Sequence, residues 1–181
     1  NIQHNLDYGF LSPVENLVNT LAHDERIMNI SGENLNNYTQ FDPSTFVHKD
    51  DLVENTLNRY FVTVKNNHHN IGTIFLGSAW GGYMEDLLFM PKKAYDPRLR
   101  SWYENTVGHP GEAVTTDPYV TSVSDQMVVS VTHTIDRDGE SIGVVGIMLY
   151  LAEFQNMVAE TKIGKTGYMM VLNPNDKFVV S

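Results

Sequence analysis

The sequence predicts an α+β fold in which helices come first and an antiparallel sheet follows. Helical periodicity covers most of the first 65 residues, strand-like segments dominate from residue 71, and Asp136-Arg-Asp-Gly139 is a tight-turn signal between two of those segments. Helices followed by hairpin-linked strands are typical of α+β domains and not of alternating βαβ units. We therefore expect an antiparallel sheet that packs against its leading helices.

The first predicted element is a long helix between about residues 5 and 30. Apolar side chains recur there at steps of three and four residues, which is typical of an amphipathic helix. Ser12 followed by Pro13 suits an N-cap with proline at the first helical position. The apolar stripe must be buried against the sheet, against a second copy, or against both, and we predict a homodimer through this helix.

A polar, Asn-rich loop is expected over residues 31–45, between the first helix and a second one predicted over 48–65. Asp50 and Asp51 lie near the start of the second helix, where the helix dipole favours negative charge. His68-His69-Asn70 then predicts a turn.

Strands dominate the rest of the chain. The predicted strands are 71–76, 83–86, 127–135 and 142–151, and a short helix is predicted over 97–107. Gly81-Gly82 supplies the turn between the first two strands, and Gly108 ends the short helix. Near the far end, strands over 168–172 and 178–180 would pair around a turn at 173–176. Because an isolated hairpin is marginally stable, we interpret this end as the start of another module.

Composition excludes several classes of function. The 181-residue chain has 12 Lys and Arg against 22 Asp and Glu residues, a formal charge of −10 and no cysteine. The negative net charge argues against binding to nucleic acid, whose phosphates are bound by Lys and Arg, and against binding to anionic lipid. The absence of cysteine excludes a disulfide scaffold, a cysteine zinc site and a thiol nucleophile. Hydrophobic residues make up 41% of the chain, which is enough to build a core and excludes wholesale disorder. The length fits one domain, or one domain and part of another.

No known motif for catalysis, metal binding or cofactor binding is complete in this sequence. Gly164-Lys165-Thr166 is similar to the end of a phosphate loop, but Ala159 stands where that loop needs its first glycine. The seven histidines are scattered, and the pair His68-His69 is interpreted as part of a solvated turn. The acidic pair Glu85-Asp86 is interpreted as surface charge. With no nucleophile elbow or zinc-protease motif, we predict no catalytic residue, no metal and no cofactor.

One segment combines basic and aromatic side chains. Four of the 12 basic residues lie within nine positions, with aromatic residues among and after them: Lys92, Lys93, Arg98, Arg100, Tyr95, Trp102, Tyr103 and Tyr119. An Arg guanidinium can bind a carboxylate through two hydrogen bonds, and Tyr and Trp add donors and rings. The segment therefore favours a site for a small anion or carboxylate. The alternative is a structural loop in which an Arg pairs with Asp96 or with a backbone carbonyl.

Residues 95–103, Tyr-Asp-Pro-Arg-Leu-Arg-Ser-Trp-Tyr, closely resemble the Tyr-Asp-Pro-Arg-x-Arg-x-Trp-Tyr signature of double Cache (dCache) sensor domains. The surrounding order is similar as well, with a Gly-rich turn at 77–83, then Asp117-Pro118-Tyr119, and then the strand Ile142-Gly-Val-Val-Gly-Ile147. Lys162-Ile-Gly-Lys-Thr-Gly-Tyr168 resembles the opening of a second, membrane-proximal module. The resemblance implies a PAS-like Cache module, an antiparallel sheet with a long N-terminal helix.

The resemblance also implies a function, the extracytoplasmic ligand-sensing domain of a bacterial transmembrane receptor. Methyl-accepting chemotaxis receptors are the commonest setting, and histidine kinases and diguanylate cyclases are the alternatives. The parent protein would be anchored in the inner membrane, and this fragment would be a soluble, periplasmic part of it. By this reading, residues 1–40 are the helix and loop, 41–154 the membrane-distal ligand-binding module, and 155–181 a linker and the first hairpin of an incomplete membrane-proximal module.

Part of the family shares a pattern for amino-acid receptors, and this sequence resembles it. By that pattern Tyr95, Arg100, Trp102 and Tyr103 would hold the carboxylate of the ligand, and Tyr119 would line the side of its amine. All of these residue types are present at the expected spacing. The resemblance therefore implies a small-molecule ligand with a carboxylate.

The sequence departs from the pattern where the ammonium group of an amino acid would bind. Met148 stands at the position of the usual aspartate, and Thr121 at a second acidic position. Removing the counter-ion of a buried ammonium costs about 3–5 kcal/mol, and each 1.4 kcal/mol is about tenfold in affinity. We therefore predict a carboxylate or other anion whose apolar or neutral remainder faces Met148. The alternatives are an amino-acid sensor in which Asp117, Asp125 or Glu85 supplies the acid, and a structural dimerisation module that binds no ligand.

Overall fold

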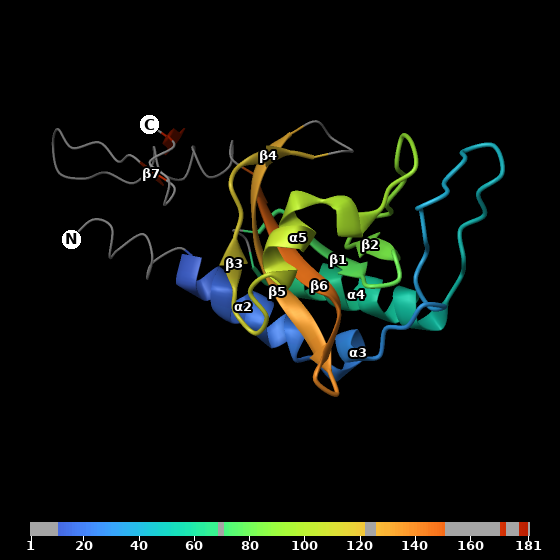
Figure 1. Cartoon of the computed structure of the whole chain (residues 1–181), viewed down its shortest axis with the longest axis horizontal. Helices are drawn as coiled ribbons and strands as arrows, with labels where there is room; N and C mark the ends of the chain where they lie inside the picture. Colours follow the sequence, from blue (N-terminus) through green and yellow to red (C-terminus); the bar gives the residue numbers. More distant parts are fainter. Residues whose placement is uncertain (1–10, 69–70, 122–125, 151–170, 173–177, 181) are drawn as a thin grey trace, which may run out of the picture.

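An antiparallel sheet with helices on both faces forms the centre of the protein (Figure 1). The computed structural model describes residues 11–68, 71–121, 126–150, 171–172 and 178–180. The helices are α2 Ser12–Ala22, α3 Glu25–Met28, α4 Leu52–Asn66 and α5 Ser101–Val107, with a 3-10 turn, η2, at Pro97–Leu99. The strands of the sheet are β1 Thr73–Ser78, β2 Tyr83–Glu85, β3 Val114–Thr115, β4 Tyr119–Val120, β5 Met127–Arg137 and β6 Glu140–Tyr150.

The strands run in the order β2-β1-β6-β5, and both β3 and β4 pair with the outer edge of β5. Every pairing is antiparallel, so the α+β fold predicted from the sequence is confirmed. The four strands predicted between residues 71 and 151 are all present, close to their predicted bounds. Among the described residues, no helix combines the length and the apolar character needed to cross a membrane.

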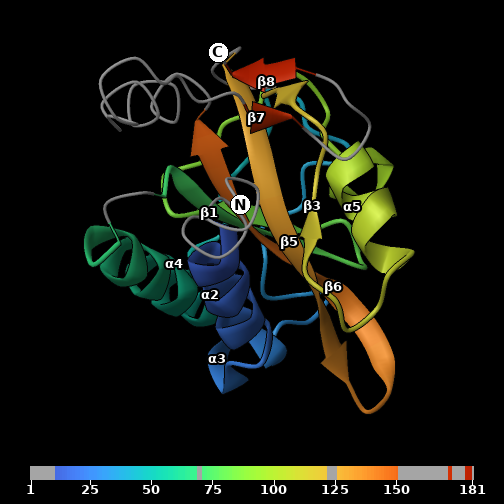
Figure 2. The same cartoon turned by 90° about the vertical axis from the view of Figure 1, so that its left-hand side faces the viewer.

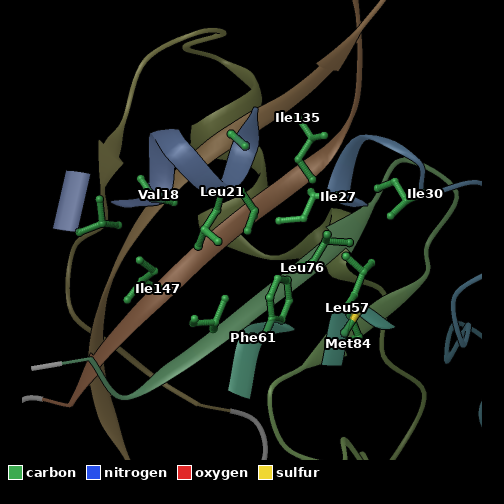
Figure 3. Packing of buried hydrophobic residues seen from close by; sticks show 14 of the residues in the cluster. Val18, Leu21, Ile27, Ile30, Leu57, Phe61, Leu76, Met84, Ile135 and Ile147 are labelled. Atoms are coloured by element: carbon green, nitrogen blue, oxygen red, sulfur yellow. The ribbon is translucent and has the colours of Figure 1, made fainter. Parts of the chain in front are cut away.

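Alternation along the strands divides the hydrophobic core into two clusters, one on each face of the sheet. Figure 2 shows α2 and α4 on one side of the strands and α5 on the other. On the α2 side, Val18, Leu21 and Phe61 pack with Ile147 of β6, and all four side chains are fully buried (Figure 3). The apolar stripe of α2 is thus covered by the sheet of the same chain and does not require a partner subunit.

The N-terminal helix is shorter than its periodicity predicts. α2 ends at Ala22, and Asp24 then has extended dihedrals, with φ −75° and ψ 126°. The Asp24 carboxylate accepts a hydrogen bond from the backbone N–H of Arg26 at 2.9 Å, so it caps a new helix, α3. The single helix predicted over residues 5–30 is therefore wrong at this point, because a local cap interrupts a periodicity that continues on both sides of it.

Capping also decides where two helices begin. Asp51 has extended dihedrals and its carboxylate accepts a hydrogen bond from the backbone N–H of Val53 at 2.8 Å, so α4 starts at residue 52 and not at 48. Ser12 was predicted to be an N-cap, but Leu11 before it already has helical dihedrals. Ser12 is therefore the first residue of α2 and not its cap.

Two glycines let the segment 95–103 and its neighbours pack directly on the sheet. At Gly77 of β1, a Cβ atom would lie 2.7 Å from Cβ of Pro97 and 2.8 Å from Cη2 of Trp102. At Gly146 of β6, the ring of Phe75 occupies the space that a Cβ atom would need. The aromatic side of the sheet is therefore built around backbone positions that only glycine can supply.

The β5–β6 hairpin turns where the sequence predicted a tight turn. Asp138 and Gly139 both have positive φ angles, 55° and 83°, as the two central residues of a type I′ turn do. Arg137 beside the turn donates from Nη1 to the carbonyl oxygens of Met28 and Ile30, at 3.0 and 3.1 Å. The hairpin is thereby tied to the end of α3.

The described part of the far-end hairpin pairs as expected. β7 Val171–Leu172 is antiparallel to β8 Phe178–Val180. Residues 168–170, the turn at 173–176 and the linker predicted before them lie outside the described residues, as do His69 and Asn70 of the predicted turn. The assignment of this end to a second module remains a prediction.

Candidate ligand-binding site

The segment 95–103 begins with a capped turn that fixes one of its two arginines. Asp96 accepts hydrogen bonds from the backbone N–H of Arg98 at 3.0 Å and from its Nε and Nη2 at 2.9 and 2.7 Å. The side-chain bonds to Arg98 hold the pKa of the Asp96 carboxyl below its usual value. Arg98 is therefore a structural residue, as the loop interpretation of the sequence expected for one arginine.

Arg100 occupies the junction between η2 and α5. It is the N-cap residue of α5, and its carbonyl oxygen accepts hydrogen bonds from the backbone N–H groups of Tyr103 and Glu104 at 2.9 and 3.0 Å. Its side chain is half-buried, and the guanidinium carbon lies 5.5 Å from the centroid of the Tyr95 ring. A cation therefore borders the aromatic face of the sheet.

Buried aromatic rings cover that face. Trp102 packs edge-on against Phe75 with ring centroids 4.9 Å apart, and Tyr95 packs against Tyr83 at 4.8 Å. Burial raises the pKa of the Tyr95 hydroxyl, although Arg100 and a hydrogen bond with Trp102 act in the opposite direction. The Tyr95 hydroxyl therefore stays protonated at neutral pH and is available as a hydrogen-bond group.

Met148 lies in the same cluster, among hydroxyl groups. It is only 6% exposed, and its register partners are Thr73 on β1 and Ser130 on β5. The hydroxyl of Ser130 is 2.8 Å from that of Tyr119, and the hydroxyl of Thr73 is 2.9 Å from that of Tyr150. Burial raises the pKa of Tyr119 to about 12, so its hydroxyl is neutral at ordinary pH. The position where an ammonium group would need an acid thus holds a thioether with neutral hydroxyls on both sides.

The structure brings most of the predicted site residues together. Tyr95, Trp102, Tyr103 and Met148 belong to one buried cluster, and Tyr119 packs against it. Arg100 borders the cluster at Tyr95. Their role in binding a ligand remains a prediction.

Thr121, the remaining predicted site residue, lies just after β4 and is 8% exposed. Its backbone N–H donates to the carbonyl oxygen of Gln126 at 2.9 Å, and its hydroxyl accepts from the Gln126 N–H at 3.4 Å. Of the acids considered as substitutes for the missing aspartate, Asp117 is exposed and Asp125 lies outside the described residues. The third, Glu85, is placed differently from what the sequence suggested.

The acidic pair Glu85-Asp86 is not surface charge, contrary to the prediction. Asp86 is 3% exposed, accepts a hydrogen bond from the backbone N–H of Ile74 at 2.9 Å and pairs with Lys65 Nζ at 2.7 Å. Glu85 is half-buried, and its Oε1 accepts a hydrogen bond from the Tyr83 hydroxyl at 2.7 Å. Burial raises the pKa of Glu85 to about 6, against a smaller opposite effect of the Tyr83 bond. The prediction was wrong because two adjacent strand residues face opposite layers of the protein, and both layers are covered here.

The hydroxyl groups of Thr73, Ser130 and Tyr150 were not predicted from the sequence to belong to the site. The period-two alternation of strand 127–135 was a usable signal, since it places Val128 and Ser130 on one face. The alternation does not reveal that β1 and β6 bring Thr73 and Tyr150 to the same face, because that depends on strand order and register.

The chain is similar to a family of known proteins and to several solved structures. A family model described as methyl-accepting chemotaxis protein-like, first PDC sensor domain, matches residues 27–156. Methyl-accepting chemotaxis protein McpB of Bacillus subtilis is 30% identical over 112 residues, which are 62% of this chain and 16% of that protein. The match therefore spans only a small part of the length of that relative.

Two solved structures have a similar fold. The ligand-binding domain of the Pseudomonas fluorescens chemoreceptor CtaA, in complex with L-leucine, gives a TM-score of 0.68 at 22% identity, covering 96% of this chain and 62% of that one. The ligand-binding domain of the Pseudomonas aeruginosa amino-acid chemoreceptor PctC, in complex with GABA, gives 0.68 at 18% identity, covering 96% of this chain and 68% of that one.

Proposed function

The chain belongs to the family of methyl-accepting chemotaxis protein-like PDC sensor domains, which confirms the resemblance to Cache sensors, and we propose that it senses a small carboxylate-bearing metabolite. The carboxylate binds at Arg100 and the neighbouring aromatic residues. The part of the ligand next to the carboxylate carbon carries no charge and faces Met148. The function is recognition and signalling, without catalysis.

The observation that carries the proposal is the pairing of a cation with a neutral, buried surface. The Arg100 guanidinium lies 5.5 Å from the Tyr95 ring centroid, and hydroxyl and indole groups beside it supply further donors for a carboxylate. At Met148 a thioether and neutral hydroxyls offer no counter-ion for an α-ammonium group. A carboxylate that lacks an α-amino group fits both halves of the site.

We extend the proposal to the whole receptor. The parent protein is anchored in the inner membrane and places this domain in the periplasm, with residues 41–154 as the membrane-distal module and 155–181 as the start of a proximal one. Its output is chemotactic signalling; a histidine kinase or diguanylate cyclase output is the alternative. A homodimer through the N-terminal helix would use the polar outer face of α2, where Asn16 and Thr20 are exposed, since its apolar stripe already packs on the sheet.

A thermal-shift experiment tests the proposal with pairs of ligands that differ only in the α-amino group. We expect 4-methylpentanoate to raise the melting temperature more than L-leucine, which has the same carbon skeleton with an α-amino group added. Arg100→Ala should abolish the shift, because the carboxylate loses its two-bonded partner. Lys93→Ala is the matched control, since Lys93 is an exposed cation of the same segment.

Three results would contradict the proposal. An undiminished shift in Arg100→Ala would remove the carboxylate assignment. Micromolar binding of L-leucine by the wild type would remove the role given to Met148. No shift with any of a panel of organic acids, amino acids and amines would favour the structural dimerisation module.

A further inference from the structure

A half-buried acid of β2, Glu85, lies on the aromatic face of the sheet. Glu85 is the register partner of Phe75 on β1, and partners across an antiparallel pair project from the same face. Phe75 in turn contacts Trp102 on that face, with ring centroids 4.9 Å apart. Asp86, the next residue, projects to the opposite layer, where it pairs with Lys65 of α4.

The surroundings of Glu85 connect it electrostatically to the carboxylate site. Glu85 acts on the pKa values of both Tyr95 and Tyr119, and Arg100 acts on the same two tyrosines in the opposite direction. The two tyrosines are therefore within electrostatic reach of a cation and of an acid.

The Glu85 carboxylate retains acceptor capacity for a ligand. Its hydrogen bond within the described part of the chain comes from the Tyr83 hydroxyl, which uses one lone pair of Oε1. A carboxylate has about four such acceptor positions. Asp86 differs, because it accepts a backbone N–H and an ammonium group at the same time.

We infer that Glu85 is a second ligand-binding residue of this site, where it receives a positively charged group that the ligand carries at a distance from its carboxylate. The favoured ligands are then ω-amino carboxylates and not α-amino acids. The inference rests on the proposed function, because it takes the carboxylate site at Arg100 as given. It adds a class of ligand and a residue that the signature segment does not contain.

Sheet geometry explains why the amino group must be remote. Met148 of β6 is opposite Thr73 of β1, whereas Glu85 of β2 is opposite Phe75, two strands and two residues away from Met148. With strands about 4.8 Å apart and a rise of about 3.4 Å per residue, the backbone positions of Met148 and Glu85 are about 10–12 Å apart. An amino group on the carbon next to the carboxylate would meet Met148, and only one several bonds farther along reaches Glu85.

Three isomeric or matched five-carbon acids test this inference by calorimetry: pentanoate, L-2-aminopentanoate and 5-aminopentanoate. The wild type should bind 5-aminopentanoate at least about tenfold more tightly than pentanoate, consistent with a charge-assisted hydrogen bond, and L-2-aminopentanoate least well. Glu85→Gln should lose the preference for 5-aminopentanoate and keep the affinity for pentanoate. Glu104→Gln, which removes an exposed acid of α5, is the matched control and should leave both unchanged.

The pH dependence of binding separates the effect of the Glu85 charge from the effect of its shape. The preference for 5-aminopentanoate should weaken from pH 7.5 to pH 5 in the wild type and show no such change in Glu85→Gln. The titratable and charged groups that act on Glu85, or on which it acts, come from every neighbouring element: Tyr38, Tyr83, Asp86, Tyr95, Tyr119 and Lys65. Burial raises the pKa of all four tyrosines, so none of them titrates in this range.

The outcomes distinguish this inference from the proposed function. Pentanoate binding that depends on Arg100, without any preference for 5-aminopentanoate, would overturn the role of Glu85 alone. A preference that survives in Glu85→Gln would also overturn it and would leave Glu85 as a residue that only orients Tyr83. If none of the three acids binds, both the proposed function and the inference fail.

Discussion

Replacing Met148 with aspartate should convert this domain into a sensor of α-amino acids. Met148 is 6% exposed, and its register partners Thr73 and Ser130 carry hydroxyl groups that can donate to a carboxylate. Partners across antiparallel strands have Cβ atoms about 4.5–5.5 Å apart, so an aspartate at this position would lie within reach of both hydroxyls. Met148→Asp therefore creates an oriented acid beside the carboxylate site.

The size of the gain follows from the cost of leaving a buried ammonium group unpaired. That cost is about 3–5 kcal/mol, which corresponds to about a hundredfold to a few thousandfold in affinity. We expect the affinity for L-leucine to rise by at least about a hundredfold, and that for 4-methylpentanoate to fall. Without ligand the variant should melt at a lower temperature than the wild type, because it buries a carboxylate without a counter-ion, and L-leucine should raise that temperature again.

Isothermal titration calorimetry of the wild type, Met148→Asp and Met148→Asn with both ligands measures these effects. The asparagine variant matches the shape of aspartate without its charge, so it should gain little affinity for L-leucine. A folded Met148→Asp protein with an unchanged ratio of the two affinities would refute the reasoning. The wild-type ratio alone tests the same point if the aspartate variant is too unstable to titrate.

Three further predictions concern stability. Burial raises the folded-state pKa of Glu85 from 4.5 to about 6, so the folded protein holds this proton more tightly than the unfolded chain does. The free energy of unfolding should therefore fall by about 2 kcal/mol as the pH rises from 4.5 through 6. Urea denaturation at pH 4.5 and 7 should show this loss in the wild type relative to Glu85→Gln, and an equal pH dependence of the two proteins would contradict it. Gly77→Ala should lower the free energy of unfolding by about 1–3 kcal/mol, because the new Cβ would lie 2.8 Å from Trp102 Cη2. An unchanged melting temperature would show that the segment 95–103 does not pack on β1. Asp86→Ala should lower the free energy of unfolding by about 3–5 kcal/mol, because it leaves the partly buried Lys65 ammonium unpaired. Chemical denaturation should show that adding Lys65→Met to this variant recovers part of the loss.

Local signals in the sequence were sufficient for most secondary structure. The turn at Asp138-Gly139 was predictable because that dipeptide accepts positive φ angles, and the structure confirms it. The interruption of the first helix at Asp24 was not predicted, because the apolar periodicity of α2 and α3 continues through it. A single cap of about 1 kcal/mol decides such a boundary, and periodicity does not register it.

The sequence by itself determined the family, the α+β fold and the segment that carries Arg100 and Trp102, because a short contiguous signature and a period-two alternation are both local properties of the chain. The resemblance also indicated Tyr119, Thr121 and Met148. Only the tertiary structure decided which further side chains share their face of the sheet. From the sequence, Glu85 was interpreted as surface charge, with a place in the site only as one of three alternative acids, and the pairing of β2 with β1 puts it opposite Phe75 on the aromatic face. Which residues share a face of a sheet depends on strand order and register, and these are set by packing between segments that are far apart in the sequence.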